Sequence, residues 1–222
     1  MLDIENVNYR YKNGERDVLK GVTAHFENGK LHSVVGPSGS GKTTLLSIMA
    51  GLDSPRSGMV AIDGEDLAEM DLDRYRRERV SMIFQAFQLF PLLTAVENVC
   101  YPMELNGMER KKAVDTAKAL LGSVGIGADK YKRYPANLSG GEQQRVAIAR
   151  SLASGARLIL ADEPTGNLDV ASGEAVIGIL GDLAHRDGYC IIVVTHNMDI
   201  AAASDVVFRM SDGVVTVDNE NF

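Results

Sequence analysis

GPSGSGKTT, residues 36–44, is the stretch of this sequence around which the other segments are organised. It fits the pattern G-x-x-x-x-G-K-[ST], in which backbone N–H groups surround a phosphate and a lysine adds positive charge. Residues 31–35 before it read as a strand, and residues 44–50 after it read as a helix, whose positive end also favours an anion. We therefore predict that the chain binds a nucleoside triphosphate.

Each residue type in this stretch suits the binding of phosphate. Glycines allow strained backbone angles and a close approach to an anion. Lys42 adds a compact positive charge for the outer phosphates, and Thr43 offers a hydroxyl to Mg²⁺. We expect all of the following to bind the nucleotide: Gly36, Pro37, Ser38, Gly39, Ser40, Gly41, Lys42, Thr43 and Thr44.

Composition restricts the classes of protein to consider. The 222 residues, 45% of them hydrophobic and 24% charged, suit one soluble compact domain with an inserted subdomain. The 23 basic and 30 acidic residues give a net charge of −7, which disfavours a nucleic-acid partner. Cys100 and Cys190 lack metal spacing, and we expect a reducing cytoplasm. We expect no secretory signal and no membrane span, since no apolar run approaches roughly 20 residues.

Hydrophobic periodicity indicates an α/β arrangement with a helical region in its middle. Strands are expected at residues 2–9, 18–26, 31–35, 59–62, 80–84, 157–161, 189–194, 206–210 and 214–217. Helices are expected at residues 44–50, 71–79, 112–124 and 171–185 and after Ser139, and residues 86–154 have a helical pattern throughout. Turns are expected at residues 12–15 and 211–213.

Five apolar residues lie near the start of the helical region: Phe87, Leu89, Phe90, Leu92 and Leu93. Two interpretations stay open for them. Either they pack within the helical region, or they form a groove in which a partner docks.

Polar residues follow four apolar strands at their carboxyl ends. They are residues 36–44, Gln85, Asp162 with Glu163, and His196. The ligand crevice of an open α/β sheet lies at this edge. Each residue alone means little, but their shared placement predicts one site.

These residues have the chemistry that ATP hydrolysis requires. Mg²⁺ prefers oxygen ligands and retains several waters, so we expect Thr43 and Asp162 to bind it, with Gln85 as a third ligand, directly or through water. Glu163 can orient the attacking water and accept its proton. His196 is expected to reach the γ-phosphate.

A second anion site is predicted at residues 138–145, LSGGEQQR. Ser139 and Glu142 have the spacing of a capping box at a helix start. Gly140 and Gly141 follow the cap directly, although glycine destabilises a helix relative to alanine. They leave an uncovered row of N–H groups at a positive helix end, which suits an anion.

Two tyrosines lie at the end of the first expected strand. Tyr9 and Tyr11 are two residues apart, so both rings would share one face. They are either a surface aromatic pair, or one of them stacks on a nucleobase.

Together these segments resemble the ATP-binding cassette ATPases, and the resemblance covers essentially the whole chain. The matching motifs are the phosphate loop, Gln85, LSGGEQ at 138–143, LILADEP at 158–164, GNLD at 166–169 and TH at 195–196. The resemblance implies an α/β fold: a P-loop NTPase (RecA-like) core with an N-terminal antiparallel β subdomain and an inserted helical subdomain. Residues 1–222 would form a single nucleotide-binding domain, with β subdomain and core in 1–86 and 157–222 and the helical subdomain in 87–156.

The resemblance also implies a shared site. Two copies of the chain would form a head-to-tail homodimer that encloses two ATP molecules with Mg²⁺. The phosphate loop of one copy would face the other copy's nucleotide-binding residues Ser139, Gly140, Gly141 and Glu142. The catalytic residues would be Glu163, His196, Gln85 and Asp169, the last at the dimer seam. Tyr11 occupies the position of the family's base-stacking aromatic and is preferred to Tyr9.

Residues 85–99 and 162–169 resemble one branch of the family more finely, the branch that serves lipoprotein release, macrolide or antimicrobial-peptide export, and cell division. This implies a separate four-helix transmembrane permease, which would hold the ATPase at the cytoplasmic face of the cell membrane. Hydrolysis would power transport or transmit mechanical force. Relatives that act on DNA or ribosomes carry coiled-coil insertions, zinc cysteines or fused cassettes, and the sequence has none. An ATP-gated signalling clamp on a membrane partner stays as the alternative.

Overall fold

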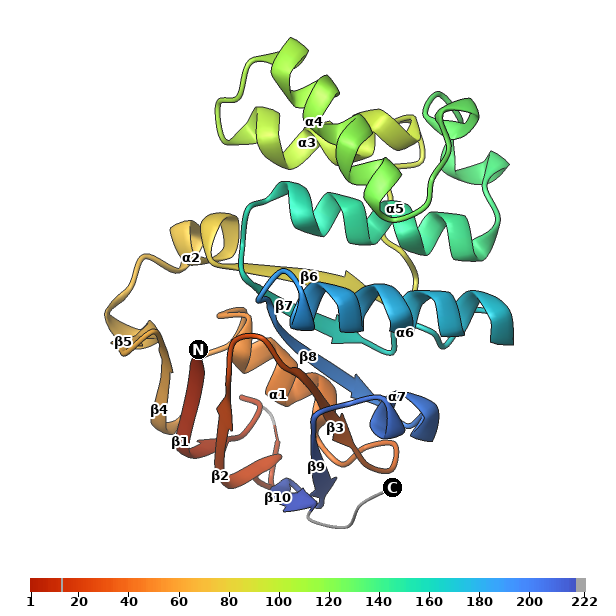
Figure 1. Ribbon diagram of the computed structural model, residues 1–222. Helices are drawn as coiled ribbons and strands as arrows, with labels where there is room; N and C mark the ends of the chain where they lie inside the picture. Colours follow the sequence, from red (N-terminus) through yellow and green to blue (C-terminus); the bar gives the residue numbers. More distant parts are fainter. Residues whose placement is uncertain (13, 219–222) are drawn as a thin grey trace.

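A six-stranded sheet lies at the centre of the computed structural model, which describes residues 1–12 and 14–218 (Figure 1). Its strand order is β10-β9-β3-β8-β7-β6. Five parallel strands are β3 (Leu31–Val35), β6 (Val80–Phe84), β7 (Leu158–Asp162), β8 (Cys190–Thr195) and β9 (Val206–Ser211). Strand β10 (Val214–Asp218) closes the predicted hairpin by pairing antiparallel with β9.

Strands β7 and β8 are buried on both faces, as their continuous apolar sequences predict. Alternate residues point into two separate cores. Leu158 and Leu160 belong to the core that contains helix α1 (Lys42–Met49). Ile159 and Ala161 belong to the core formed with helices α5 (Gly140–Ala153) and α6 (Val170–His185).

A second, antiparallel sheet has the order β2-β1-β4-β5 and lies beside the first (Figure 1). Its strands are β1 (Leu2–Tyr9), β2 (Leu19–Phe26), β4 (Ser57–Ile62) and β5 (Glu65–Asp66). Three of them were predicted within two residues at each end, and β5 was missed because it is too short to show periodicity. The turn predicted at residues 12–15 includes Asn13, which lies outside the described residues.

The helical layer lies at the opposite end from the antiparallel sheet (Figure 1). It contains α3 (Ala95–Leu105), α4 (Arg110–Ser123) and α5, with the short 3-10 turns η2 (Ala128–Lys130) and η3 (Pro135–Asn137). The predicted stripe on α4 is buried at Ala113, Ala117, Leu121 and Val124 and half-buried at Leu120. These helices fall within residues 87–156, and the proposed subdomain boundaries themselves stay a prediction.

Three short helical elements complete the structure: η1 (Leu67–Glu69), α2 (Leu72–Glu78) and α7 (Met198–Ala202). The sequence predicted α2 but not the other two, which are only one turn long. No helix in residues 1–12 or 14–218 is long and apolar enough to cross a membrane.

His32 is a buried titratable residue in β3, with only 1% of its surface exposed. It lies between Phe26 and Phe208, with ring centroids 5.3 and 6.4 Å away. Its Nε2 atom accepts the Glu27 N–H at 3.2 Å, so the proton of the neutral ring is on Nδ1, which donates to the Ile191 carbonyl at 3.3 Å. Burial lowers the pKa of His32 to about 4.

We expect this histidine to destabilise the fold in acid. The unfolded chain takes up a proton near pH 6.5 and the folded chain only near pH 4, so stability falls as the pH decreases between these values. The loss amounts to about 3 kcal/mol. Urea unfolding should show a smaller pH dependence in His32→Gln, whose amide does not titrate, whereas the exposed His25→Gln should keep the loss. An unchanged pH dependence in His32→Gln would contradict this explanation.

Candidate functional site

A cavity of about 820 Å³ lies at the carboxyl ends of β3, β6, β7 and β8. It is lined by Tyr11, Val18, Ser38, Gly39, Gly41, Lys42, Thr43, Thr44, Gln85, Asp162, Glu163 and His196. The four polar elements predicted at the strand ends therefore meet in one place, as expected for an α/β sheet.

The phosphate loop keeps its shape because glycine is required at two positions. A Cβ atom on Gly36 would lie 2.1 Å from the carbonyl oxygen of Met210 in β9, so the loop lies directly against the sheet. Gly41 precedes α1 with a φ of 109°, in the left-handed region that favours glycine. Gly36, Pro37 and Ser40 complete the loop without lining the cavity.

Lys42 and Thr43 bring their side chains to the start of α1. The Lys42 ammonium donates to the carbonyls of Gly36 at 2.8 Å and Pro37 at 3.1 Å, within its own loop. Thr43 is exposed, and both side chains line the cavity. A cation, a hydroxyl and a helix N-terminus thus share one wall, which suits a polyphosphate.

Asp162 ends β7 inside the cavity and is half-buried. Its pKa is raised first by burial and then by the neighbouring Glu163, and Lys42 only partly opposes this. A cation bound nearby would stabilise the ionised form of this carboxylate. The described residues contain no cluster of three His, Cys, Asp or Glu side chains that could hold a metal alone. Thr43, Asp162 and Gln85 line the same cavity and carry oxygen atoms of the kind that Mg²⁺ prefers as ligands, beside water and phosphate.

Glu163 has the most constrained backbone and side chain of the site. Its φ of 45° is unusual for a residue other than glycine. Its carboxylate accepts the Thr195 hydroxyl at 2.8 Å, the His196 N–H at 3.1 Å and the His196 Nδ1 at 2.7 Å. The predicted base and the predicted phosphate contact are therefore one hydrogen-bonded pair. The role of Thr195 was missed, although its place after a buried strand indicated a site residue.

Gln85 lies against the loop that follows β7. Its carbonyl accepts the Asn167 side-chain amide at 2.9 Å, and its own amide donates to Asn167 Oδ1 at 3.4 Å. A Cβ atom on Gly166 would lie 2.7 Å from the Gln85 amide nitrogen, so a side chain at this position would displace the Gln85 amide. No local sequence pattern pairs these residues, because they are far apart in the chain.

The capping box at the start of α5 is confirmed. Glu142 accepts the Ser139 N–H at 2.8 Å and donates its own N–H to the Ser139 hydroxyl at 3.3 Å. The Glu142 carboxylate also pairs with Lys130 at 2.6 Å. Glu142 thus has structural partners that fix the helix start, and none of residues 139–142 lines the cavity of their own chain.

The two glycines of this helix start differ. A Cβ on Gly141 would lie 2.6 Å from the Ser172 hydroxyl, so packing against α6 explains this glycine. A Cβ on Gly140 would meet nothing closer than 3.6 Å. Internal packing therefore does not explain Gly140.

Asp169 lies at the start of α6, outside the cavity. Its carboxylate accepts the Ser172 N–H at 3.0 Å, which caps the helix and lowers the pKa of Asp169. It is exposed, and its catalytic assignment stays a prediction.

The two tyrosines have different environments. Tyr9 is buried and donates its hydroxyl to Asp53 at 3.1 Å. Tyr11 is 49% exposed, lines the cavity, and its hydroxyl lies 2.8 Å from that of Thr44. The two rings pack edge to face with their centroids 5.1 Å apart, so Tyr9 helps to fix the position of the Tyr11 ring. This arrangement favours Tyr11 for stacking on a base.

Comparison with known proteins agrees with this geometry. The sequence model of a family described as ABC transporter matches residues 19–166. The chain belongs to this family. It is an ATPase, and ATP is its nucleotide.

Relatives of this ABC ATPase have related names. The lipoprotein-releasing system ATP-binding protein LolD of Shewanella frigidimarina is 44% identical, over 98% of this chain and 92% of that protein. The uncharacterised ABC transporter ATP-binding protein YclH of Bacillus subtilis is 40% identical, over 98% of this chain and 96% of that protein. The macrolide export ATP-binding/permease protein MacB of Shigella flexneri is 42% identical over 97% of this chain, which spans only 34% of MacB.

A solved structure of the cassette MJ0796, a dimer in a post-hydrolysis state with ADP and Pi, has a TM-score of 0.88 and 38% identity, covering 98% of both chains. The likeness extends over both sheets and the helical layer. The fold predicted from the sequence is thereby confirmed.

Stacking by Tyr11 predicts a loss of ATP affinity on its removal. Tyr11→Ala should weaken ATP binding about fivefold or more, since stacking of a base on an aromatic ring contributes about 1–3 kcal/mol. Tyr11→Phe should bind nearly as well as the wild type. Titration with a fluorescent ATP analogue measures both, with the similarly exposed Tyr134→Ala as control. Equal affinities of Tyr11→Ala and the wild type would contradict stacking.

Proposed function

We propose that two copies of this ABC ATPase close head to tail around two ATP molecules, and that hydrolysis reopens them to drive a membrane permease. The observation that carries this proposal is the separation of the two anion sites. Ser139 is exposed and a Cβ atom on Gly140 would make only ordinary van der Waals contacts, yet neither residue lines the cavity of its own chain. A second chain that supplies Ser139, Gly140 and Gly141 would complete each site. The dimeric state of MJ0796 supports this arrangement.

Within each site, the residues of this chain divide the work. Lys42 and the N–H groups of the loop would bind the outer phosphates, and Tyr11 the base. Thr43, Asp162 and Gln85 would hold Mg²⁺, which neutralises charge on the phosphates when it is bound. The half-buried Asp162 favours such a cation, because its carboxylate has few other means of compensating its charge.

Glu163 would act as the general base. Its three hydrogen-bond donors hold the carboxylate in one orientation, so it can orient a water and accept its proton. His196 already donates to Glu163 and has a side chain that is 74% exposed. To donate to a phosphate oxygen as well, its ring must carry a proton on both nitrogens. His196 would then link the base to the γ-phosphate. This pair argues against a clamp that does not hydrolyse ATP.

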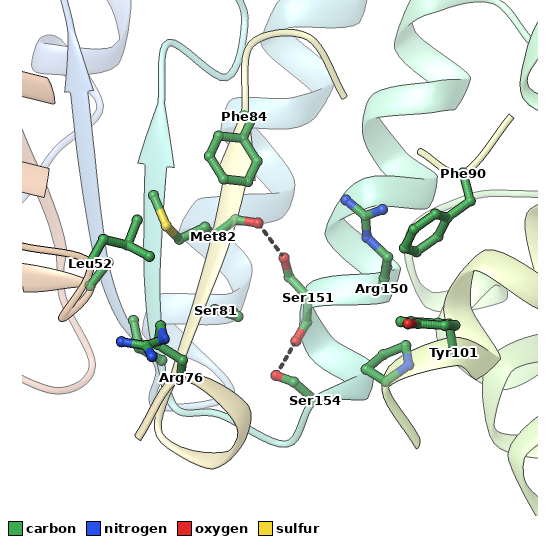
Figure 2. Close-up of a pocket in the computed structure, with 13 residues that line it drawn as sticks. Leu52, Arg76, Ser81, Met82, Phe84, Phe90, Tyr101, Arg150, Ser151 and Ser154 are labelled. Atoms are coloured by element: carbon green, nitrogen blue, oxygen red, sulfur yellow. Dashed lines mark hydrogen bonds between the residues drawn. The ribbon is translucent and has the colours of Figure 1, made fainter. Parts of the chain in front are cut away.

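The partner is proposed to be a separate permease of the lipoprotein-release and macrolide-export branch, which would hold the ATPase at the cytoplasmic face of the cell membrane. LolD and MacB among the relatives support this branch. A groove of about 310 Å³ between the central sheet and the helical layer suits a short apolar segment of such a partner (Figure 2). Leu52, Phe90 and Tyr101 line it and are 55%, 40% and 44% exposed.

The apolar residues at 87–93 lie in different environments. Phe90 lines the groove, and Leu92 is 86% exposed. Phe87, Leu89 and Leu93 are half-buried against the rest of the chain. Only part of this segment therefore contributes to the apolar lining of the groove.

Replacement of the base should separate ATP binding from hydrolysis. Glu163→Gln should lower the ATPase rate by about 100-fold or more, because general-base catalysis contributes at least that much. ATP should then hold the variant as a dimer, which light scattering can detect. Glu174→Gln, an exposed change on α6, is the matched control. Near-normal turnover in Glu163→Gln would remove Glu163 as the base.

The shared site can be tested in the same background. Ser139→Arg added to Glu163→Gln should abolish the ATP-dependent dimer, because a long cationic side chain fills the place of phosphate. ATP binding to the monomer should persist, since Ser139 lies outside that cavity. Ser123→Arg, at the exposed end of α4, should leave the dimer intact. A dimer that survives Ser139→Arg would refute the head-to-tail arrangement.

Crosslinking can test the permease partner. Cys100 and Cys190 are buried, and burial raises their pKa values to about 11 and about 12, so an introduced surface thiol should react first. Leu52→Cys carrying a photoreactive maleimide should crosslink, in membranes from the source cells, to a protein with transmembrane helices. Val214→Cys, on the opposite edge of the central sheet, should not. Equal labelling from both positions would contradict docking in the groove.

A further inference from the structure

The segment after Gln85 has an unfavourable backbone. Phe87 and Gln88 are consecutive residues with φ values of 57° and 51°, in the left-handed region that side-chain-bearing residues seldom adopt. The Phe87 N–H donates to the Phe84 carbonyl at 3.2 Å, and the Gln88 N–H to the Ala86 carbonyl at 2.5 Å. Backbone angles of this kind cost free energy, so such a turn persists only where neighbouring groups stabilise it.

Arg150, in the last turn of α5, provides that hold. Its guanidinium donates to the Gln88 carbonyl at 2.5 Å and to the Phe87 carbonyl at 3.2 Å. It also lies 5.9 Å from the centroid of the Phe90 ring, beside which Figure 2 shows it. The planar fork of an arginine matches two neighbouring oxygens in a way that a lysine cannot.

The Arg150 guanidinium also depends on the turn formed by Phe87 and Gln88. Arg150 is half-buried, and burial lowers its pKa. Across residues 1–12 and 14–218 no acidic side chain pairs with it. A desolvated charge requires hydrogen bonds in compensation, and the two carbonyls supply them.

The two ends of the segment from Gln85 to Phe90 are held by hydrogen bonds from other elements. Asn167 holds Gln85 from one side. The fully buried Asn98 of α3 holds the other end, because it accepts the Phe90 N–H at 2.8 Å and donates to the carbonyls of Leu93 and Thr94. The path between Gln85 and Phe90 therefore depends on the turn that Arg150 binds.

We propose that Arg150 is a positioning residue for hydrolysis: by holding the carbonyls of Phe87 and Gln88, it keeps Gln85 in place at the nucleotide cavity. The proposal rests on the role proposed above for Gln85. Arg150 and Phe90 also line the groove of Figure 2, so the residue that fixes the turn is one that a docked partner would touch.

The test compares Arg150→Met, Arg150→Lys, Gln85→Ala and the double variant Arg150→Met with Gln85→Ala. Arg157→Met is the matched control, because Arg157 also donates to a backbone carbonyl, that of Asp187 at 2.8 Å, and lies 4.8 Å from the ring of Tyr189. The measurements are kcat, the Mg²⁺ concentration for half-maximal rate, the affinity for ATP and the melting temperature.

Coupling through Gln85 has a distinct signature. Arg150→Met should lower kcat about tenfold, within the range of couplings between residues in contact, and should raise the Mg²⁺ requirement. The affinity for ATP should stay within about twofold, because Lys42 and the phosphate loop are untouched. The double variant should be no slower than Gln85→Ala alone, and Arg150→Lys should recover only part of the rate.

Three outcomes would overturn the proposal. If Gln85→Ala is fully active, the proposed role of Gln85 fails and positioning fails with it. If Gln85→Ala is slow but Arg150→Met is normal, or if the two losses add in the double variant, only the positioning role fails. If Arg157→Met loses as much as Arg150→Met, the effect is general destabilisation. Should Arg150→Met not fold, the same cycle with Arg150→Lys decides.

Discussion

The hydrogen-bond register of four parallel strands is the constraint on which the rest of this structure depends. Val35 pairs with Thr195, Val194 with Asp162, and Asp162 with Phe84, so the strands end within one residue of the same level. The polar residues that follow these strands therefore lie at the same edge of the sheet. A shift by one residue would also turn the alternating apolar side chains of β7 and β8 into the wrong cores. Packing and chemistry are therefore fixed by the same pairing.

The glycines show how the site is divided between function and packing. Gly36 is required because a carbonyl of β9 lies where its side chain would be, and Gly141 because a serine of α6 does. Gly140 has no such neighbour. The same short motif thus contains one glycine explained by packing within the chain and one that this packing does not explain. A glycine-rich sequence by itself does not separate these cases.

Most of the fold and much of the site follow from the sequence because they depend on local patterns. Apolar runs set β7 and β8, and the spacing of Ser139 and Glu142 sets the cap of α5. The two-residue strand β5 and the short helix α7 do not contain enough residues to show a period. The contacts of Gln85 with Asn167 and of Glu163 with Thr195 were out of reach, because these residues meet only through the tertiary fold. Sequence patterns indicated which residues meet at the cavity, but not which contacts hold them there.

Helix α5 has a mechanical consequence. It is a continuous helix of 14 residues, about 20 Å long. Its first turn is capped by Ser139, and its last turn carries Arg150, which lines the groove. A rigid rod of this length acts as a lever: a tilt of about 10° displaces one end relative to the other by roughly 3 Å, about the length of a hydrogen bond. The end that would meet a neighbour's phosphate and the end at the groove therefore cannot move independently.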